Sequence, residues 1–187
     1  MAVVKKNIIT QGLSGELGGA IVFRQVGGRT IVSTPPTQSG ELSEKQKVQR
    51  DRFQQAAFFA KAQMLNPVTK AAYQAATDEI HPNPYTVAVA DFLRGPDIEE
   101  IEFTNYTGKV GDTIRIRVMD NFRVDDVHVT IENTDGSLVE KGNALQQPNV
   151  IDWLYTATKA NASLDGDKIT IRANDFPGNI DTEVKVI

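Results

Sequence analysis

The 187-residue sequence contains no cysteine. This absence excludes disulfide frameworks, thiolate nucleophiles and cysteine-ligated zinc or iron–sulfur centres. Only two histidines are present. They are His81 and His128, and the second alternates with valines in a strand-like run that favours a solvent-facing side chain. The sequence also lacks HExxH, GxSxG and SxxK motifs. We therefore predict no catalytic residue, no cofactor-binding residue, no assigned metal ligand and no enzymatic activity.

Long apolar runs are missing as well. No stretch approaches the roughly 18 to 20 residues that a membrane span needs. Lys5 and Lys6 follow an N-terminal apolar stretch of three residues, so the long apolar segment of a secretory signal is not visible. These features predict synthesis in the cytoplasm without a signal peptide and no membrane span. Action outside the cell would then take place in a virion, a phage-tail-like particle or an extracellular filament.

The net charge of −4 is unevenly distributed. Residues 1–95 carry 11 Lys and Arg against 7 Asp and Glu, whereas residues 96–187 carry 9 against 17. Opposite signs on two domains could orient subunits head to tail, because complementary potentials steer association. The alternative is two solvated surfaces with no such role.

Glycine-punctuated β structure is predicted for the first 34 residues. Short β-branched runs occupy residues 7–10, 20–24 and 30–33, and residues 26–29 form a good hairpin turn. The glycine-rich segment 12–18 lacks both the Walker pattern and a GxGxxG that opens a helix, so a phosphate loop is not expected. Residues 34–40 have the composition of a linker.

Three helices are predicted next. Ser43 and Gln46 form a capping box before apolar residues at helical spacing. Asn66 before Pro67 starts a second helix that extends to about Glu79, and Asn83 before Pro84 starts a short third one. Gly95 and the proline after it close this half of the chain.

From residue 97 onward the hydrophobic period changes to two. Seven short alternating runs, each bounded by turn residues, occupy about ninety residues, which predicts a β-sandwich. The runs are 101–103, 114–118, 127–131, 137–140, 153–157, 169–173 and 184–187.

The second half resembles bacterial immunoglobulin-like domains of surface and virion proteins. The resemblance lies in Gly111-Asp112-Thr113-Ile114, the hairpin 134–142, the run from Trp153 to Ala157, and an Ala-x-Asp-x-x-Gly-Asn signature at residues 173–179. It implies a sandwich with Trp153 in the core. The first half resembles the N-terminal region of an uncharacterised bacterial protein family through the GLSGELG segment 12–18, Pro35, and the helix from Ser43-Glu44-Lys45-Gln46 to Phe53. That resemblance implies an architecture and no activity.

Three binding alternatives stay open. Loop carboxylates could hold calcium, which prefers oxygen ligands; these are Asp120, Asp125, Asp126, Asp165, Asp167 and Asp175. Exposed aromatic residues in sandwich loops could hold a glycan or a protein; the candidates are Tyr106, Phe122 and Phe176. Nucleic acid is not expected, although the first helix carries Lys45, Lys47, Arg50 and Arg52.

The predicted fold class is therefore α+β, with N-terminal strands and about three helices followed by an all-β immunoglobulin-like sandwich. The expected domains are 1–95 for assembly or interaction and 96–187 for the sandwich. The expected function is that of a non-enzymatic self-assembling or decorating structural protein of a phage, phage-tail-like particle or extracellular filament. The expected partners are further copies or a larger protein assembly. The alternative is a monomeric module that binds a cell-surface glycan or protein through its sandwich loops.

Overall fold

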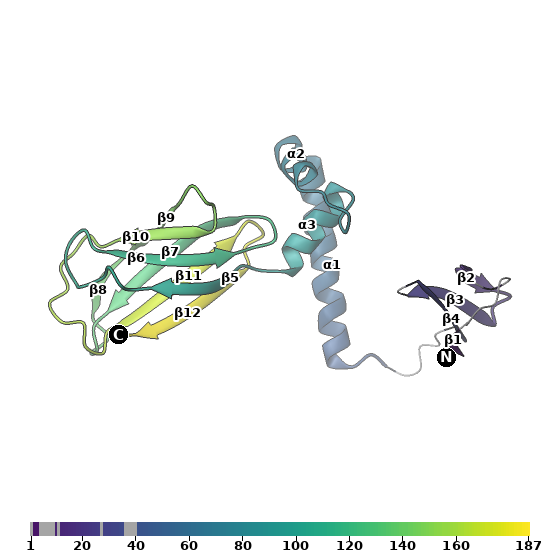
Figure 1. The fold of residues 1–187 in the computed structure, drawn as a ribbon, viewed down its shortest axis with the longest axis horizontal. Coiled ribbons are helices and arrows are strands. Elements are labelled where there is room, and N and C mark those ends of the chain that lie inside the picture. Colours follow the sequence, from purple (N-terminus) through teal and green to yellow (C-terminus); the bar gives the residue numbers. More distant parts are fainter. Residues whose placement is uncertain (1, 4–9, 11, 27, 36–40) are drawn as a thin grey trace. The chain divides into compact units, whose positions relative to one another are not determined.

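Figure 1 shows the fold in a computed structural model, which describes residues 2–3, 10, 12–26, 28–35 and 41–187. The chain divides into two compact units, Met1–Glu44 and Lys45–Ile187. The boundary expected between residues 95 and 96 falls inside the second unit, where the last helix passes into the first strand of the sandwich.

A four-stranded antiparallel sheet forms the first unit. It contains β1 (Ala2–Val3), β2 (Gly15–Leu17), β3 (Ile21–Val26) and β4 (Arg29–Ser33) in the order β1-β4-β3-β2. The runs predicted at 20–24 and 30–33 correspond to β3 and β4, and the pairing of Val26 with Arg29 closes the hairpin between them. The run predicted at 7–10 lies outside the described residues except for Thr10, which is in a turn.

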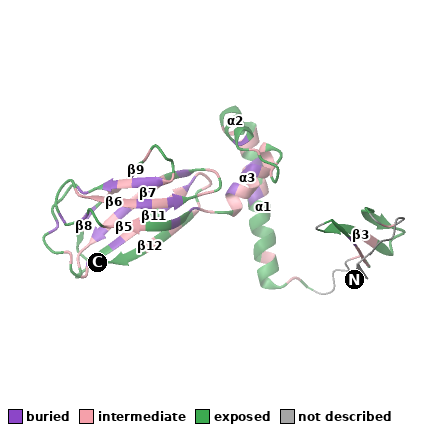
Figure 2. Ribbon diagram, viewed as in Figure 1, coloured by how far each residue is buried: buried purple, intermediate pink, exposed green. Residues whose placement is uncertain are grey.

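This sheet has one apolar face. Pairing of Leu17 with Ile21 and of Phe23 with Val32 places these four side chains on the same side, because directly paired residues share a face. Among the residues of this unit whose burial is described, Thr30 alone is buried. Figure 2 accordingly shows this sheet mostly in the colour of exposed residues. On the same face, the segment at Gly12 and Leu13 covers Thr30 and Gln25 through hydrogen bonds, and no further strand or helix in the described part of the unit covers the apolar side chains.

The three predicted helices open the second unit. They are α1 (Glu44–Leu65), α2 (Pro67–Ala75) and α3 (Pro84–Leu93). Asn66 caps α2 by accepting a hydrogen bond from the Val68 N–H, and Asn83 caps α3 by accepting one from the Thr86 N–H. In both helices proline fills the first position, where no N–H is needed.

The helices share a small core made of Ala60, Tyr73, Val87 and Ala88. Only the second half of α1 contributes to it. Residues 44–55 contain no buried residue, and Val48 and Phe53 are 64% and 57% exposed. The exposed first half of α1 is visible in Figure 2.

Two four-stranded antiparallel sheets form the sandwich (Figure 1). One has the order β5-β6-β10-β9 and the other β12-β11-β7-β8, which correspond to the A-B-E-D and G-F-C strand orders of immunoglobulin domains with one extra strand. The strands are β5 (Asp97–Glu102), β6 (Thr113–Met119), β7 (Val124–Glu132), β8 (Leu138–Asn143), β9 (Leu145–Gln146), β10 (Asp152–Thr156), β11 (Lys168–Asp175) and β12 (Ile180–Val186). The α+β fold class is confirmed.

The sandwich encloses the larger core of the chain. Its fully buried residues alternate along β6, β7 and β11, as the period of two predicts; they include Ile114, Ile116, Val127, Val129, Ile169 and Ile171. Trp153 is buried, as expected, but it stands on β10, in the A-B-E-D sheet. In antibody domains the core tryptophan belongs to strand C of the opposite sheet.

The helices and the sandwich are joined by an aromatic contact. Phe122 precedes β7 and stacks on Tyr73 of α2 with ring centroids 4.3 Å apart, and Phe176 follows β11 and lies 6.2 Å from both Tyr73 and Phe59 of α1. Gly95 lies between α3 and β5, where an added Cβ would approach the Asn179 Cβ to 2.9 Å. The backbone therefore passes close to the β11–β12 turn.

Among the described residues, no helix combines the length and the apolar character needed to cross a membrane.

Candidate functional site

Three carboxylates from three different elements meet beside the aromatic contact. Asp91 comes from α3, Asp120 directly follows β6, and Asp175 ends β11. One carboxylate oxygen from each lies within 4.8 Å of the others. The site therefore brings a helix and two sandwich loops to one point.

Backbone donors of a tight turn fix Asp175. Its Oδ1 accepts hydrogen bonds from the N–H groups of Gly178 and Asn179 at 2.8 and 2.6 Å. Gly178 has a φ of 94°, a conformation that glycine adopts without the strain of a side chain. The Asn179 Nδ2 donates to Asp175 Oδ2 at 2.7 Å and to the Phe92 carbonyl at 3.2 Å. The Ala-x-Asp-x-x-Gly-Asn segment thus forms the turn and also binds the end of α3.

Asp120 is held in a similar way by the loop that it opens. Its Oδ2 accepts hydrogen bonds from the Phe122 and Arg123 N–H groups at 3.3 and 2.8 Å. Its Oδ1 is buried and has no hydrogen-bond partner among the described residues. The loop therefore uses one carboxylate oxygen and leaves the other free.

Asp91 is fully buried on α3. Its Oδ2 accepts a hydrogen bond of 2.5 Å from the Tyr73 hydroxyl. Its Oδ1 is buried, and within the described part of the chain no group donates to it. A buried polar atom without a partner costs about 1 to 3 kcal/mol, and more when it is charged. Two such oxygens in one cluster can be satisfied by a proton, a bound water or a cation.

The electrostatics agree with a crowded acidic site. Burial and the neighbouring Asp120 and Asp175 carboxylates raise the pKa of Asp91 to about 7, although the Tyr73 hydrogen bond acts in the opposite direction. Burial also raises the pKa of Asp175. Burial and the hydrogen bond to Asp91 raise the pKa of Tyr73, so its phenol stays a neutral donor. Each group resists carrying an uncompensated charge in this position.

Positive charge close to the cluster is sparse. The Arg123 guanidinium lies over the Phe176 ring at 4.7 Å and pairs with Asp125 at 2.7 Å. Among the residues that the structure describes, no lysine or arginine forms an ion pair with Asp91, Asp120 or Asp175. No basic side chain of the described residues therefore pairs directly with the cluster, although the charge of Arg123 is close enough to lower the pKa of Asp91.

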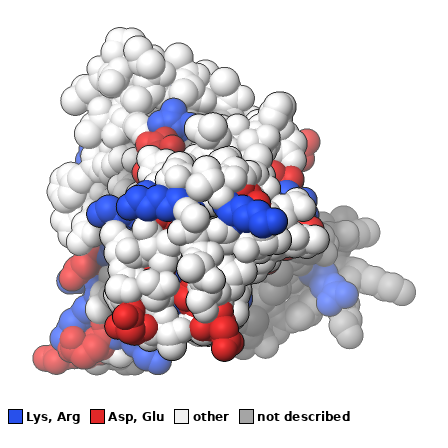
Figure 3. Space-filling model, turned by 90° about the vertical axis from the view of Figure 1, so that its left-hand side faces the viewer, with Lys and Arg blue, Asp and Glu red and all other residues white. Residues whose placement is uncertain are grey.

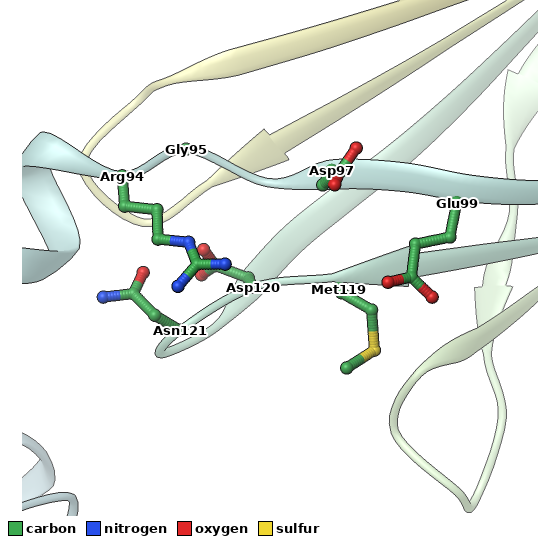
Figure 4. A pocket seen from close by; sticks show the side chains of 7 residues that line it. All are labelled: Arg94, Gly95, Asp97, Glu99, Met119, Asp120 and Asn121. Carbon is green, nitrogen blue, oxygen red and sulfur yellow. The ribbon is translucent and has the colours of Figure 1, made fainter.

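A surface pocket of about 280 Å³ reaches the cluster through Asp120. Figure 4 shows Arg94 extending over the loop that carries Asp120 and Asn121, while Asp97 and Glu99 project from β5. Since Asp120 belongs to both the pocket and the cluster, it connects the buried carboxylates with solvent.

Two of the six loop carboxylates proposed from the sequence belong to this site, namely Asp120 and Asp175. The other four lie elsewhere. Asp125 pairs with Arg123, Asp126 accepts both of its bonds from Asn174, and the buried Asp167 accepts a bond from Asn161. Asp165 is exposed. Asp91 was missed because a single aspartate in a helix gives no signal of what the helix packs against.

The aromatic candidates are packed rather than displayed. Tyr106 is 5% exposed and belongs to the sandwich core. Phe122 and Phe176 pack against the helix core and stack around Tyr73. Tyr106 therefore offers no open ring for a sugar, and Phe122 and Phe176 are only partly exposed. Turn residues beside an aromatic did not indicate a fully exposed ring.

The remaining polar candidates take part in local contacts. Arg52 donates to the Leu93 carbonyl at 3.1 Å, and Arg50 lies 3.8 Å from Asp51. His81 bonds with Asp78, and the His128 Nδ1 lies 2.8 Å from the Asn143 Oδ1. Acidic and basic side chains are interspersed over the end of the sandwich shown in Figure 3, without a patch of one sign on that face.

Comparisons with known proteins identify no family. The sequence matches no protein-family model and no curated protein. Among solved structures, the chain is similar to CopC from Methylosinus trichosporium, with 14% identity, a TM-score of 0.36, and coverage of 48% of this chain and 87% of that one. It is also similar to an engineered protein, with 20% identity, a TM-score of 0.31, and coverage of 40% of this chain and 16% of that one.

Proposed function

We propose that this chain is a non-enzymatic structural subunit that self-assembles through its N-terminal sheet, as a building or decorating component of a phage, a phage-tail-like particle or an extracellular filament. One observation carries the proposal. The sheet of the first unit presents an apolar face, formed by Leu17, Ile21, Phe23 and Val32, that no other described element of its unit covers.

A single sheet with an uncovered apolar face needs a further layer to be stable. Leu17 is 62% exposed and Ile21 39% exposed, and Phe23 and Val32 are only half-buried. Sheets need a second layer to bury such a face, and two sheets packed face to face provide it. The edge strands β1 and β2 add backbone groups that a neighbouring strand can pair with.

The occupant that we propose for the apolar face is the same face of a second copy. Residues 1–44 contain four Lys and Arg against three Asp and Glu, so two copies of this unit do not repel each other. The same apolar face on two copies has the same size and composition, so it can pack against itself, as a two-fold interface requires. The sandwich belongs to the other unit, so it could serve as the displayed module in a decorating role.

The test is sedimentation velocity and negative-stain electron microscopy of the full chain and two variants. Ile21→Lys places a charge on the apolar face, whereas Val26→Lys places it on the opposite face of the same strand. The wild-type chain and Val26→Lys should form dimers or larger homopolymers. For Ile21→Lys, the protein concentration at which half of the chains are associated should be at least tenfold higher than for the wild type. A wild-type chain that stays monomeric at all concentrations would contradict the proposal and would indicate that the sheet packs on its own second unit.

A further inference from the structure

We propose that Asp91, Asp120 and Asp175 bind one Ca²⁺ ion, which fastens α3 and the helices to the end of the sandwich. The inference is independent of the proposed assembly, since it concerns the second unit alone. It rests on the geometry of the three carboxylates and on the two buried oxygens that no group among the described residues satisfies.

The ligand atoms are of the right kind and at the right spacing. Calcium takes oxygen ligands at about 2.3 to 2.6 Å, so oxygens on opposite sides of the ion stand about 4.6 to 5.2 Å apart. One oxygen from each carboxylate lies within 4.8 Å of the others. Magnesium usually keeps several of its waters and binds through one or two carboxylates, so a site of three protein carboxylates favours calcium.

The unsatisfied oxygens point to a ligand beyond the carboxylates themselves. Asp91 is fully buried, and its Oδ1 has no donor among the described residues. The buried Oδ1 of Asp120 also has no donor among the described residues. The other oxygen of each carboxylate already accepts hydrogen bonds: Asp91 Oδ2 accepts one from the Tyr73 hydroxyl, and Asp120 Oδ2 accepts two from the Phe122 and Arg123 N–H groups. These bonds hold each carboxylate in place for an ion.

The elements around the cluster are also fixed in advance. The Asn179 side chain connects Asp175 Oδ2 to the Phe92 carbonyl at the end of α3. These hydrogen bonds hold the sandwich turn against the helix without an ion. Asp120 lines the surface pocket seen in Figure 4, so solvent reaches one of the three residues of the cluster. A cation here would neutralise charge contributed by three separate elements, which explains why it would tighten their junction.

The experiment uses the full chain treated with EDTA and dialysed, then titrated with CaCl2 or MgCl2. Native mass spectrometry and calorimetry should show one calcium per chain, with a Kd between about 10⁻⁵ and 10⁻³ M and weaker binding of magnesium. At a calcium concentration one hundred times Kd, the unfolding midpoint should rise by about 5 to 10 °C.

Three variants make the test specific. Asp91→Asn and Asp120→Asn each remove one ligand charge while keeping the size of the side chain, and Asp165→Asn makes the same charge change in an exposed loop. In EDTA the first two should be as stable as the wild type or more stable, because like charges are removed. In calcium they should be less stable than the wild type and should bind at least tenfold more weakly. Asp165→Asn should behave as the wild type.

Two outcomes would overturn the inference. One is the absence of stoichiometric calcium uptake by the wild type at millimolar concentration. The other is calcium binding that is unchanged in both Asp91→Asn and Asp120→Asn. A junction that is stabilised by acidification but not by calcium would indicate that a shared proton satisfies the cluster.

Discussion

Single residues of the β11–β12 turn contact the end of α3 and so connect the helices with the sandwich. Asn179 illustrates this, because its side-chain amide bonds to the Asp175 carboxylate and to the backbone carbonyls of Asp91 and Phe92. The last carbonyls of a helix have no partner within the helix, so a donor from the sandwich satisfies groups that burial would otherwise penalise.

Replacing this side chain should therefore weaken the junction. We expect Asn179→Ala to lower the free energy of unfolding by about 1 to 3 kcal/mol, since the Phe92 carbonyl and Asp175 Oδ2 both lose the donor that Asn179 supplies. Urea unfolding followed by circular dichroism gives the value. The matched control is Asn121→Ala in the exposed β6–β7 loop, for which a change within about 0.5 kcal/mol is expected. Equal effects of the two substitutions would show that the Asn179 contacts do not stabilise the fold.

Residues also show where sequence reasoning succeeded at this site and where it could not. Asp120 and Asp175 were among the calcium candidates because they follow strands, and carboxylates after strands gather at the sandwich ends. Asp91 could not be found in this way, since only the tertiary packing of α3 against the β11–β12 turn brings it there. The same packing partly buries Phe122 and Phe176, whose flanking turn residues suggested exposure.

At the level of elements, the sequence predicted the first residues of the helices more accurately than their last residues. Both Asn-Pro pairs mark the observed first residues of α2 and α3. The predicted end of α2 near Glu79 was too late, because the helix ends at Ala75. Asp78 then forms a turn of its own by accepting bonds from the Ile80 and His81 N–H groups. The two-residue β9 was not predicted, since so short a strand has no period to detect.

The caps should also account for helix stability in a measurable way. We expect Asn83→Ala to cost about 1 kcal/mol, because the Thr86 N–H loses its acceptor, whereas Asn83→Ser or Asn83→Asp should cost little. The shift of the denaturation midpoint at constant slope measures the effect. An unchanged midpoint in Asn83→Ala would mean that packing of Val87 and Ala88 alone fixes the start of α3.

At the scale of the whole molecule, the two units differ in how they can be stable. The second unit has two cores, one under the helices and one inside the sandwich, and the aromatic contact around Tyr73 joins them. The first unit has one buried residue in its described part. Composition could not reveal this contrast, because β-branched residues are common in both units and only the pairing register shows which faces remain uncovered.

This contrast leads to a prediction for a shortened chain. A protein spanning residues 45–187 should fold by itself, unfold cooperatively and stay monomeric, because it keeps both cores and lacks the apolar sheet face that we propose as the assembly surface. Sedimentation velocity gives its mass and urea unfolding its cooperativity, with the full chain as the control. Homopolymers of the shortened chain would move the assembly surface to the exposed half of α1 or to the sandwich. An unfolded shortened chain would show that the N-terminal sheet completes the fold of the second unit, so that its apolar face is covered within one molecule.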